Sequence, residues 1–594
     1  MTVAFAFEND IEVGESLPPM TAHAVSVSLP TWRANVGYEE GEDWVVSKMK
    51  TGYPRFFIHV SIEKFAVAIV SKYGQSGDRA MLFPSHVIAS RCLDFFSKQA
   101  PDLDQRQIRI VDLVPTAEKE RSEELSLISP KISAVLFPQE RFPIAKAFWQ
   151  HSGDGISSRR AEFCHSLFTK GALVDRTRLD EVPRSCKGPR RYHRKTSIDV
   201  TNGPDALNGE VQDPTQFVEE RFGRNLNISL TANAKLAVKR RIAGSLTANV
   251  GLSEALALER DTERARNVPD FTEDDVYLYP CGMSSIFNTH RNLMTTRGGL
   301  KSIVFGFPYI DTLKIVQKFG PGCVFYGFGS SEELDDLEKK LEAGERFLAL
   351  FTEFPGNPLL KSPDLVRIRA LADRYDFFVI VDETVGNFLN VNVLPYADVV
   401  VSSLTKVFSG DSNVMGGSAI LNPKAPHYKI LKQLWENDYE DNHWAEDSIF
   451  LERNSRDFVS RIERINANAE AICDVLCAHP RVKELNYPKY SPTRCFYDKC
   501  RTPTGGYGGL LSATFYSKQD AIAFFDNLDT AKGPSLGTNF TLSSPYVILA
   551  HYGELDWAAS YGVDANLVRF SVGLEDTDKL IKIFRHALDS IPSN

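Results

Sequence analysis

The sequence predicts an α/β domain with a mainly parallel central sheet, preceded by an extra N-terminal region and followed by a smaller α+β domain. Short, almost wholly apolar runs recur in the middle of the chain, at 301–305, 347–351, 377–381 and 397–401. Such runs are typical of strands buried on both faces, as in a parallel sheet. Helical stretches separate them, and this alternation predicts helices packed on a sheet. Ligands of such sheets bind at the carboxyl ends of the strands.

The segments around this sheet follow in chain order. Residues 1 to about 30 lack a periodic pattern, and residues 38–170 mix strand and helix signals. A stretch rich in Pro, Gly, Asn and charge comes next, which is typical of a linker. The tail from about Pro426 is helix-rich and then has strands near 508–516 and 567–573. We therefore expect four parts: an N-terminal region of unknown role (1–175), a linker (176–213), a large domain with an N-terminal arm (214–425) and a small C-terminal domain (426–594).

Three helices are expected in the large domain. Residues 230–243 and 254–265 follow a helical pattern, and so does the stretch from Ser362 to Tyr375. The last of these opens with Ser-Pro-Asp, which predicts an N-cap followed by a first-turn proline.

Length and composition exclude several classes of protein. A chain of 594 residues is too long for one core, so two or more domains are expected. The formal charge of −9 argues against a nucleic-acid binder. The nine cysteines are scattered without the paired spacing of a zinc site, so we expect no metal site and a reducing compartment. The N-terminus resembles no targeting peptide and no apolar run is long enough to cross a membrane, so a cytoplasmic protein is expected.

A lysine follows the last of the apolar runs. Lys406 ends the stretch Ser-Ser-Leu-Thr-Lys directly after 397–401. A buried amine is a candidate Schiff-base nucleophile, because burial lowers its pKa. The hydroxyls of Ser403 and Thr405 could hold a phosphate beside it. The same pattern also fits a lysine that leaves a strand for solvent.

Two further polar residues follow neighbouring predicted strands. Asp382 ends the run 377–381, and a carboxylate there could keep a pyridinium nitrogen protonated. An ordinary strand-end ion pair is the alternative. Asn357 follows the run 347–351 in Pro-Gly-Asn-Pro, where its amide could donate to a phenolic oxygen. That segment also fits a simple turn.

Three more candidates come from other parts of the chain. Gly282 and Met283 precede a helical stretch, and a helix start exposes backbone N–H groups to a phosphate. Tyr309, after the run 301–305, could stack on a ring or be a half-buried core residue. Arg569 lies in a strand-like segment and could bind a carboxylate or form an interdomain ion pair.

The sequence also contains a weak internal echo. Tyr53-Pro-Arg, followed by a helical stretch, resembles Phe222-Gly-Arg, followed by helices. The spacings that follow differ, so chance explains the echo at least as well as an ancient partial duplication does. We assign it no function.

The order of these motifs is more specific than any one of them. Gly-Met, Tyr, Asn-Pro, Asp, Ser-x-Thr-Lys and Arg-Phe-Ser-Val-Gly occur in that order. Together they resemble the Cys/Met-metabolism family of pyridoxal-phosphate enzymes, which have the aspartate-aminotransferase fold (fold type I). The resemblance covers roughly 215–594. Segments such as Glu-Glu-Arg-Phe-Gly-Arg-Asn-Leu are similar to its fungal cystathionine γ-synthase branch.

The resemblance implies a role for each candidate. Lys406 binds the cofactor covalently and acts as the general base. The cofactor phosphate is held by Ser403, Thr405, Gly282 and Met283, with Arg224 of a neighbouring subunit. The cofactor ring is contacted by Asp382 at its nitrogen, Asn357 at its hydroxyl and Tyr309, which stacks on it and assists proton transfer. The substrate carboxylate is bound by Arg569, Ser535 and Leu536.

The implied activity is γ-replacement on an O-acyl-L-homoserine, expected to be the O-acetyl ester, with L-cysteine as the nucleophile and L-cystathionine as the product. Alternatives are a secondary-metabolism paralogue with a carbon, nitrogen or sulfide nucleophile, a γ-lyase, and a non-catalytic relative. The expected partners are small amino acids and further copies of the chain in a dimer-built tetramer with shared active sites, with no nucleic acid or membrane.

Three positions depart from the family pattern. Phe222 replaces a usual tyrosine, which removes one phosphate contact. Glu383 stands where many members have asparagine. Pro534 replaces the usual Glu or Val before Ser-Leu-Gly, which puts the pocket for the substrate side chain in doubt.

Overall fold

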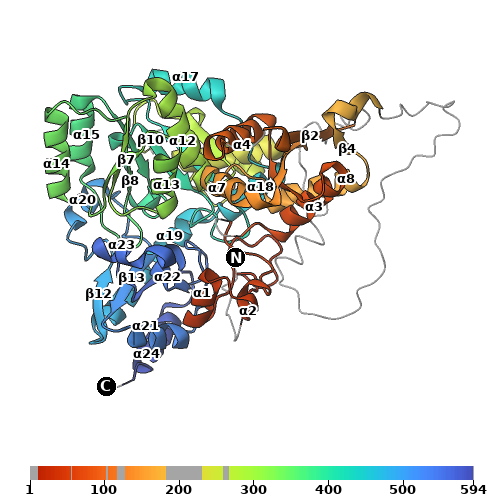
Figure 1. Cartoon of the computed structure of the whole chain (residues 1–594). Helices are drawn as coiled ribbons and strands as arrows, with labels where there is room; N and C mark the ends of the chain where they lie inside the picture. The colour runs from red at the N-terminus through yellow and green to blue at the C-terminus, as the bar shows by residue number, and fades with distance from the viewer. Residues whose placement is uncertain are drawn as a thin grey trace.

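A computed structural model describes residues 11–54, 57–101, 105–116, 128–181, 230–258 and 266–592. Within these residues the strands form three sheets, which follow one another along the chain (Figure 1). No helix in the described part of the chain is both long enough and apolar enough to cross a membrane.

The largest sheet has the strand order β5-β11-β10-β9-β8-β6-β7. Its strands are β5 (Val276–Tyr279), β6 (Ser302–Phe305), β7 (Cys323–Tyr326), β8 (Ala349–Glu353), β9 (Phe378–Asp382), β10 (Val399–Ser403) and β11 (Gly417–Leu421). The strands from β10 to β7 are parallel, and β11 and β5 are antiparallel to their neighbours. The predicted parallel sheet is confirmed: each apolar run forms a strand that begins one or two residues late.

Both faces of this sheet are covered, which explains why its strands are apolar throughout. In β10, Val399 and Val401 join one core cluster and Val400 joins the other. The first face is covered by α12 (Gly282–Arg297), α13 (Ile310–Lys318) and α17 (Tyr428–Asp438). The second face is covered by α10 (Thr231–Ala243), α14 (Ser331–Glu342) and α15 (Leu365–Tyr375).

Two predicted helices differ from the observed ones. The helix expected from Ser362 begins at Leu365, because the side chain of Asp364 accepts a hydrogen bond from the backbone N–H of Arg367 and forms the cap. The proline therefore lies before the cap and not in the first turn. The helix expected over 254–265 is α11 (Leu252–Ala257), and residues 259–265 lie outside the described part.

The C-terminal sheet has the order β12-β13-β16-β15-β14. Its strands are β12 (Val482–Asn486), β13 (Leu510–Phe515), β14 (Ala531–Lys532), β15 (Leu542–Ser544) and β16 (Leu567–Ser571). Three helices pack on it: α19 (Phe458–Cys477), α21 (Lys518–Asn527) and α24 (Thr577–Asp589). The central position of β16 places Arg569 in the middle of this sheet.

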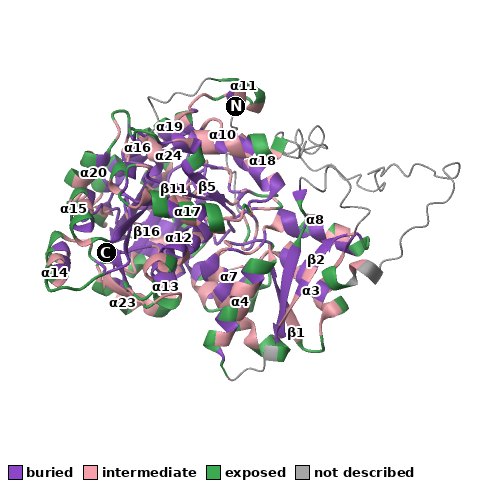
Figure 2. Cartoon of the chain, turned by 90° about the horizontal axis from the view of Figure 1, so that it is seen from above, coloured by how far each residue is buried: buried purple, intermediate pink, exposed green. Residues whose placement is uncertain are grey.

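The N-terminal sheet is antiparallel, with the order β1-β3-β2-β4. Its strands are β1 (Asp78–Phe83), β2 (Arg109–Pro115), β3 (Ile132–Pro138) and β4 (Leu173–Asp175), and its helices are α3 (Val60–Tyr73), α4 (His86–Gln99), α7 (Phe142–Ser152) and α8 (Ser158–Thr169). Figure 2 shows these elements grouped at one side of the large sheet. Helices α4 and α7 share a core cluster with α12 and α13, so a continuous apolar core joins the two parts.

The first described residues are irregular, as expected, but they are also buried. Leu17, Val25 and Leu29 are at most 5% exposed. The backbone N–H of Val25 donates to the Ser412 carbonyl at 2.8 Å, and that of Leu29 to the Lys532 carbonyl at 2.9 Å. The segment therefore packs against the rest of the chain and leads toward the carboxyl edge of the large sheet.

Candidate active site

A cavity of about 180 Å³ lies at the carboxyl ends of β8, β9 and β10, where ligands of parallel sheets bind. The ends of these strands, the start of α12 and Arg569 on β16 form one part of its wall. Residues of the N-terminal region, among them His23, Tyr53 and Ser158, form another part. The N-terminal region, the large domain and the C-terminal domain therefore all contribute residues to the cavity wall.

Lys406 lies in the turn after β10 and is 6% exposed. Its Nζ donates to the hydroxyl of Tyr53 at 3.0 Å and to Oγ of Ser535 at 3.2 Å. The Nζ also lies 4.3 Å from the centre of the Tyr53 ring. The lysine therefore points into the cavity and not into solvent.

Asp382 ends β9 and lies opposite Val401 of β10. This confirms the prediction that Asp382 lies on the strand next to the one that leads to Lys406. Burial raises the pKa of its carboxyl, and hydrogen bonding from Thr384 opposes that rise. The backbone N–H of Thr384 donates to it at 2.8 Å. A cation near this half-buried carboxylate would be favoured.

Glu353 is a site residue that the motifs did not reveal. It pairs with Asp382 across β8 and β9, and its two carboxyl oxygens accept the backbone N–H groups of Tyr309 and Asn357. Burial, followed by the charge of Asp382, raises the pKa of Glu353 to about 8. Its position two residues after a predicted strand was the only signal in the sequence. Glu353 positions two of the predicted ring contacts.

Tyr309 and Asn357 both line the cavity. The Oδ1 of Asn357 accepts from Nη1 of Arg569 at 3.3 Å, so its NH₂ group is the part that remains to donate to a ligand. Tyr309 precedes the first turn of α13. The structure thus brings both residues to the edge where the sequence predicted them.

The start of α12 forms a tight cradle with the end of β10. A Cβ on Gly282 would lie 2.6 Å from the Cβ of Ser403, so only glycine allows this approach. Cys281 is the N-cap residue, but its side chain makes no capping hydrogen bond to α12, and its thiol donates instead to the Gly153 carbonyl at 3.3 Å. The first N–H groups of α12, including that of Met283, are therefore suited to an anion in the cavity.

Thr405 lines the cavity, but its hydroxyl already has a backbone partner. It donates to the Gly416 carbonyl at 3.2 Å and accepts the Gly416 N–H at 3.1 Å. A phosphate contact from Thr405 would compete with this pair. The backbone N–H of Ser403 donates to Oγ1 of Thr384 at 2.8 Å, whereas its hydroxyl makes no hydrogen bond to the residues that the structure describes.

Arg569, which the sequence predicted to bind a carboxylate, is 3% exposed. Its guanidinium donates to the Ser535 carbonyl at 2.8 Å and to the Pro534 carbonyl at 3.5 Å, and lies 4.5 Å from the Tyr546 ring. Among the residues that the structure describes, no carboxylate pairs with it. A buried charge that has only neutral partners is suited to bind an anionic group. Leu536 also lines the cavity.

Tyr53 is the second site residue that the motifs did not identify. It belongs to the internal echo, to which the sequence assigned no function. In the structure its hydroxyl is the nearest oxygen partner of the Lys406 amine. The only local signal was the Tyr-Pro-Arg string, and no spacing argument linked it to a lysine 353 residues away.

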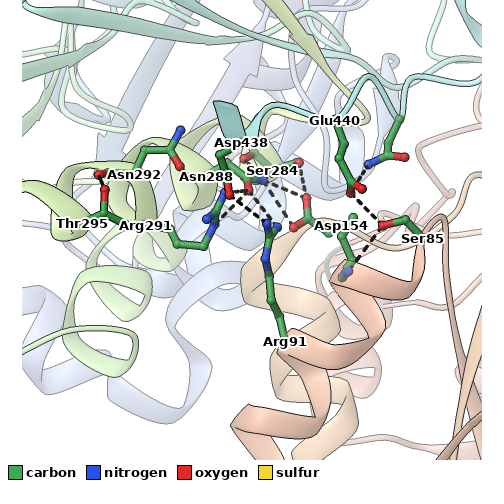
Figure 3. Close-up of polar contacts among 12 residues, drawn as sticks. Ser85, Arg91, Asp154, Ser284, Asn288, Arg291, Asn292, Thr295, Asp438 and Glu440 are labelled. Atoms are coloured by element: carbon green, nitrogen blue, oxygen red, sulfur yellow. Dashed lines mark hydrogen bonds and ion pairs between the residues drawn. The ribbon is translucent and has the colours of Figure 1, made fainter. Parts of the chain in front are cut away.

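The N-terminal region packs directly behind the start of α12 (Figure 3). Asp154 accepts hydrogen bonds from the side chains of Ser284 and Asn288, the latter at 3.0 Å. Burial raises the pKa of Asp154 to about 6, although Arg91 and Arg291 are near enough to oppose that rise. These contacts fix the first turns of the helix whose N–H groups face the cavity.

Three predicted or noted positions are not part of the described site. Glu383 forms a buried ion pair with Arg266 at 2.8 Å and is not among the residues that line the cavity. Phe222 and Arg224 lie outside the described residues. The predicted contact of Arg224 with a cofactor phosphate therefore stays a prediction.

Two family models match this chain. One, described as "Cys/Met metabolism PLP-dependent enzyme", matches residues 272–589, which is more than half of the chain. The chain belongs to this family. Its cofactor is pyridoxal phosphate, its fold is fold type I, and the resemblance inferred from the motif order is confirmed. The second model, "Fungal trans-sulfuration enzyme, N-terminal domain", matches residues 61–157, within the region whose role the sequence left open.

Curated relatives match almost the whole chain. The cystathionine gamma-synthase of Neurospora crassa is 55% identical over 97% of this chain and 98% of its own length. That of Saccharomyces cerevisiae is 40% identical over 97% of this chain and 98% of its own length. The cystathionine gamma-synthase-like enzyme iboG2 of Amanita muscaria is 42% identical over 98% of this chain and 97% of its own length.

The described residues fit the family's cofactor. A buried lysine amine, a half-buried strand-end carboxylate and a helix start at a glycine surround one cavity. These groups suit an aldehyde, a pyridine nitrogen and a phosphate, respectively. Lys406, Asp382 and the cradle of Gly282 and Ser403 would hold them.

Proposed function

We propose that this enzyme replaces the γ-acyloxy group of an O-acyl-L-homoserine, the O-acetyl ester in the first instance, with the sulfur of L-cysteine to form L-cystathionine. The observation that carries the proposal is that the Lys406 amine and the buried Arg569 guanidinium line the same cavity. A lysine base and a carboxylate receptor suit an α-amino acid. The similarity to two fungal cystathionine gamma-synthases supports cysteine as the second substrate.

Arg569 binds the substrate carboxylate and so brings the α-carbon toward Lys406. The amine of Lys406, which contacts Tyr53 and Ser535, removes the α-proton and returns it to a neighbouring atom as the reaction proceeds. Pyridoxal phosphate, when bound, supplies the electron sink for this chemistry. Asp382 keeps the cofactor ring nitrogen protonated.

The remaining site residues hold these groups in place. Ser403 and the N–H groups of Gly282 and Met283 bind the phosphate. Glu353 fixes the backbones on which Tyr309 and Asn357 lie. In this arrangement Tyr309 stacks on the cofactor ring and assists proton transfer, and Asn357 donates to the ring hydroxyl.

The enzyme acts as a homo-oligomer in this proposal. Arg224 of a neighbouring subunit contacts the cofactor phosphate. The enzyme is located in the cytoplasm, where its amino-acid substrates are available. Sedimentation of the holoenzyme and cofactor titration of Arg224→Ala test this part. A monomer with unchanged cofactor affinity in the variant would contradict it.

A substrate panel tests the activity. The holoenzyme is incubated with O-acetyl- or O-succinyl-L-homoserine and with cysteine, sulfide, proline or a β-keto acid, and products are identified by mass spectrometry. Cystathionine from the acetyl ester and cysteine is the expected product. The matched control is Lys424→Ala, at an exposed lysine that pairs with Asp270, and the inactive variant is Lys406→Ala.

A second candidate is a paralogue with another nucleophile. The similarity to the cystathionine gamma-synthase-like enzyme iboG2 favours such a paralogue over a lyase. A product from proline, sulfide or a β-keto acid, without cystathionine from cysteine, would establish this alternative. Release of 2-oxobutanoate alone would instead indicate a γ-lyase.

A further inference from the structure

Some residues of the N-terminal region line a more exposed part of the active-site cavity. Lys406 and Arg569 at the inner part are 6% and 3% exposed, whereas the His23 side chain is 17% exposed. His23, His59 and Ser158 line the same cavity and have no role in the reaction proposed above. A polar cluster at the more exposed part of a reaction cavity is positioned to meet a ligand that enters second.

These residues form a connected group. His23 and His59 stack with ring centres 6.0 Å apart. The Nδ1 of His23 lies 2.9 Å from Oγ of Ser158, and its Nε2 lies 3.6 Å from a carboxyl oxygen of Glu162. His59 is held by the backbone, because its Nε2 lies 3.0 Å from the Ala22 carbonyl and its Nδ1 accepts from Ser61. The hydroxyl of Ser158 and the imidazole of His23 in the cavity wall therefore lie next to the carboxylate of Glu162, which is not itself a lining residue.

The charges of this group suit a zwitterion. Burial lowers the pKa of His23 to about 4, so the imidazole is neutral at neutral pH and does not repel an ammonium group. Glu162 is 54% exposed and supplies a negative charge beside it. With the imidazole proton on Nδ1, His23 donates to Oγ of Ser158, so the Ser158 hydroxyl can donate to a carboxylate while Glu162 binds an ammonium group.

The lining of the cavity also includes apolar side chains. The N-terminal part contributes Val25 and Ile156, and the large domain contributes Met283 and Ile286. An apolar lining disfavours water more than it disfavours a thiol or methylene group. The cavity therefore combines a polar head site with a passage suited to an unbranched side chain that ends in sulfur.

We propose that His23, Ser158 and Glu162 form the subsite of the second substrate, which is an α-amino acid with a terminal thiol. The proposal rests on the proposed function, since it locates the nucleophile of that reaction. Glu162 binds the ammonium group of the nucleophile, Ser158 with His23 binds its carboxylate, and the thiol points inward. The N-terminal domain thereby selects the nucleophile and favours replacement over hydrolytic elimination.

Steady-state kinetics of the holoenzyme with variants at this subsite test the proposal. Ser158→Ala should raise KM for cysteine about three- to ten-fold, as expected for one lost hydrogen bond, and should leave KM for the O-acyl-homoserine unchanged. The fraction of 2-oxobutanoate among the products should rise. Ser166→Ala, at an exposed serine on the same helix, is the matched control.

An analogue that lacks the ammonium group separates a contact from a structural effect. Glu162→Gln should raise KM for cysteine but not for β-mercaptopropionate, because only cysteine carries the group that Glu162 binds. Equal KM values for cysteine in the parent and both variants would overturn the subsite, even when the parent forms cystathionine. A parent that forms no cystathionine would overturn the proposed function and with it this inference.

Discussion

Replacement of Arg569 should affect activity and stability in different ways. The guanidinium is buried, and its partners in the structure are the oxygens of Asn357, Pro534 and Ser535. Arg569→Met removes the partner of the substrate carboxylate, and loss of one member of a buried charge pair costs about 2–5 kcal/mol. At about 1.4 kcal/mol per tenfold, kcat/KM for the O-acyl-homoserine should fall about thirty- to several-thousand-fold.

The same replacement should leave the melting temperature of the apoprotein unchanged or raised. A buried charge without a carboxylate partner in the described residues is costly, and an apolar side chain of similar volume removes that cost. The assay is kcat/KM with cofactor loading measured by absorbance, beside differential scanning calorimetry. Arg585→Met, at an exposed arginine of α24, is the control. A near-parental kcat/KM for Arg569→Met would refute the carboxylate role, and a large fall in melting temperature would refute the argument from unpaired charge.

Three further substitutions test the rest of the site. Gly282→Ala should weaken cofactor binding at least about tenfold in a fluorescence titration, because its Cβ would lie 2.6 Å from that of Ser403; unchanged affinity would disprove the cradle. Tyr53→Phe removes a hydroxyl that accepts from Lys406, so kcat should fall about three- to ten-fold with an unchanged melting temperature. A parental kcat would mean that this hydroxyl is not used. Burial and a neighbouring aspartate raise the pKa of Glu353 from 4.5 to about 8, so its protonated form is favoured by folding. The stabilisation is fully present below the unfolded pKa and is lost as pH rises through the folded pKa. The melting temperature of the apoprotein relative to that of Glu353→Gln should therefore fall between pH ~5 and ~8, and a constant difference would show that Glu353 has an ordinary pKa.

Much of the fold followed from local patterns. The apolar runs predicted β6, β8, β9 and β10, because strands buried on both faces need apolar side chains at every position. Parallel strands bring their carboxyl ends to one edge, which is why Asp382 and Lys406 were expected near each other. The exact helix start at Leu365 was not predicted, since Ser362 and Asp364 are both good caps and only the tertiary structure selects one.

The rest of the site depends on docking between distant segments. Tyr53 reaches Lys406 because the first described segment, residues 11–54, packs against the segments of Ser412 and Lys532, and no local pattern encodes that path. Glu353 lies two residues after the predicted strand, and its role depends on the backbone N–H groups of Asn357, in the loop that follows, and of Tyr309, 44 residues earlier. The contact between His23 and Ser158 joins residues 135 positions apart, one in the segment 11–54 and the other in α8.

Isotope tracing of the reacting carbon tests the central claim most directly. The holoenzyme is given O-acetyl-L-homoserine labelled with heavy carbon at Cγ and L-cysteine labelled with heavy sulfur, and the products are read by mass spectrometry and carbon NMR. The account predicts cystathionine that carries both labels on adjacent atoms, and its loss in Lys406→Ala. Heavy carbon found only in 2-oxobutanoate, or cysteine recovered unchanged beside a consumed ester, would contradict it.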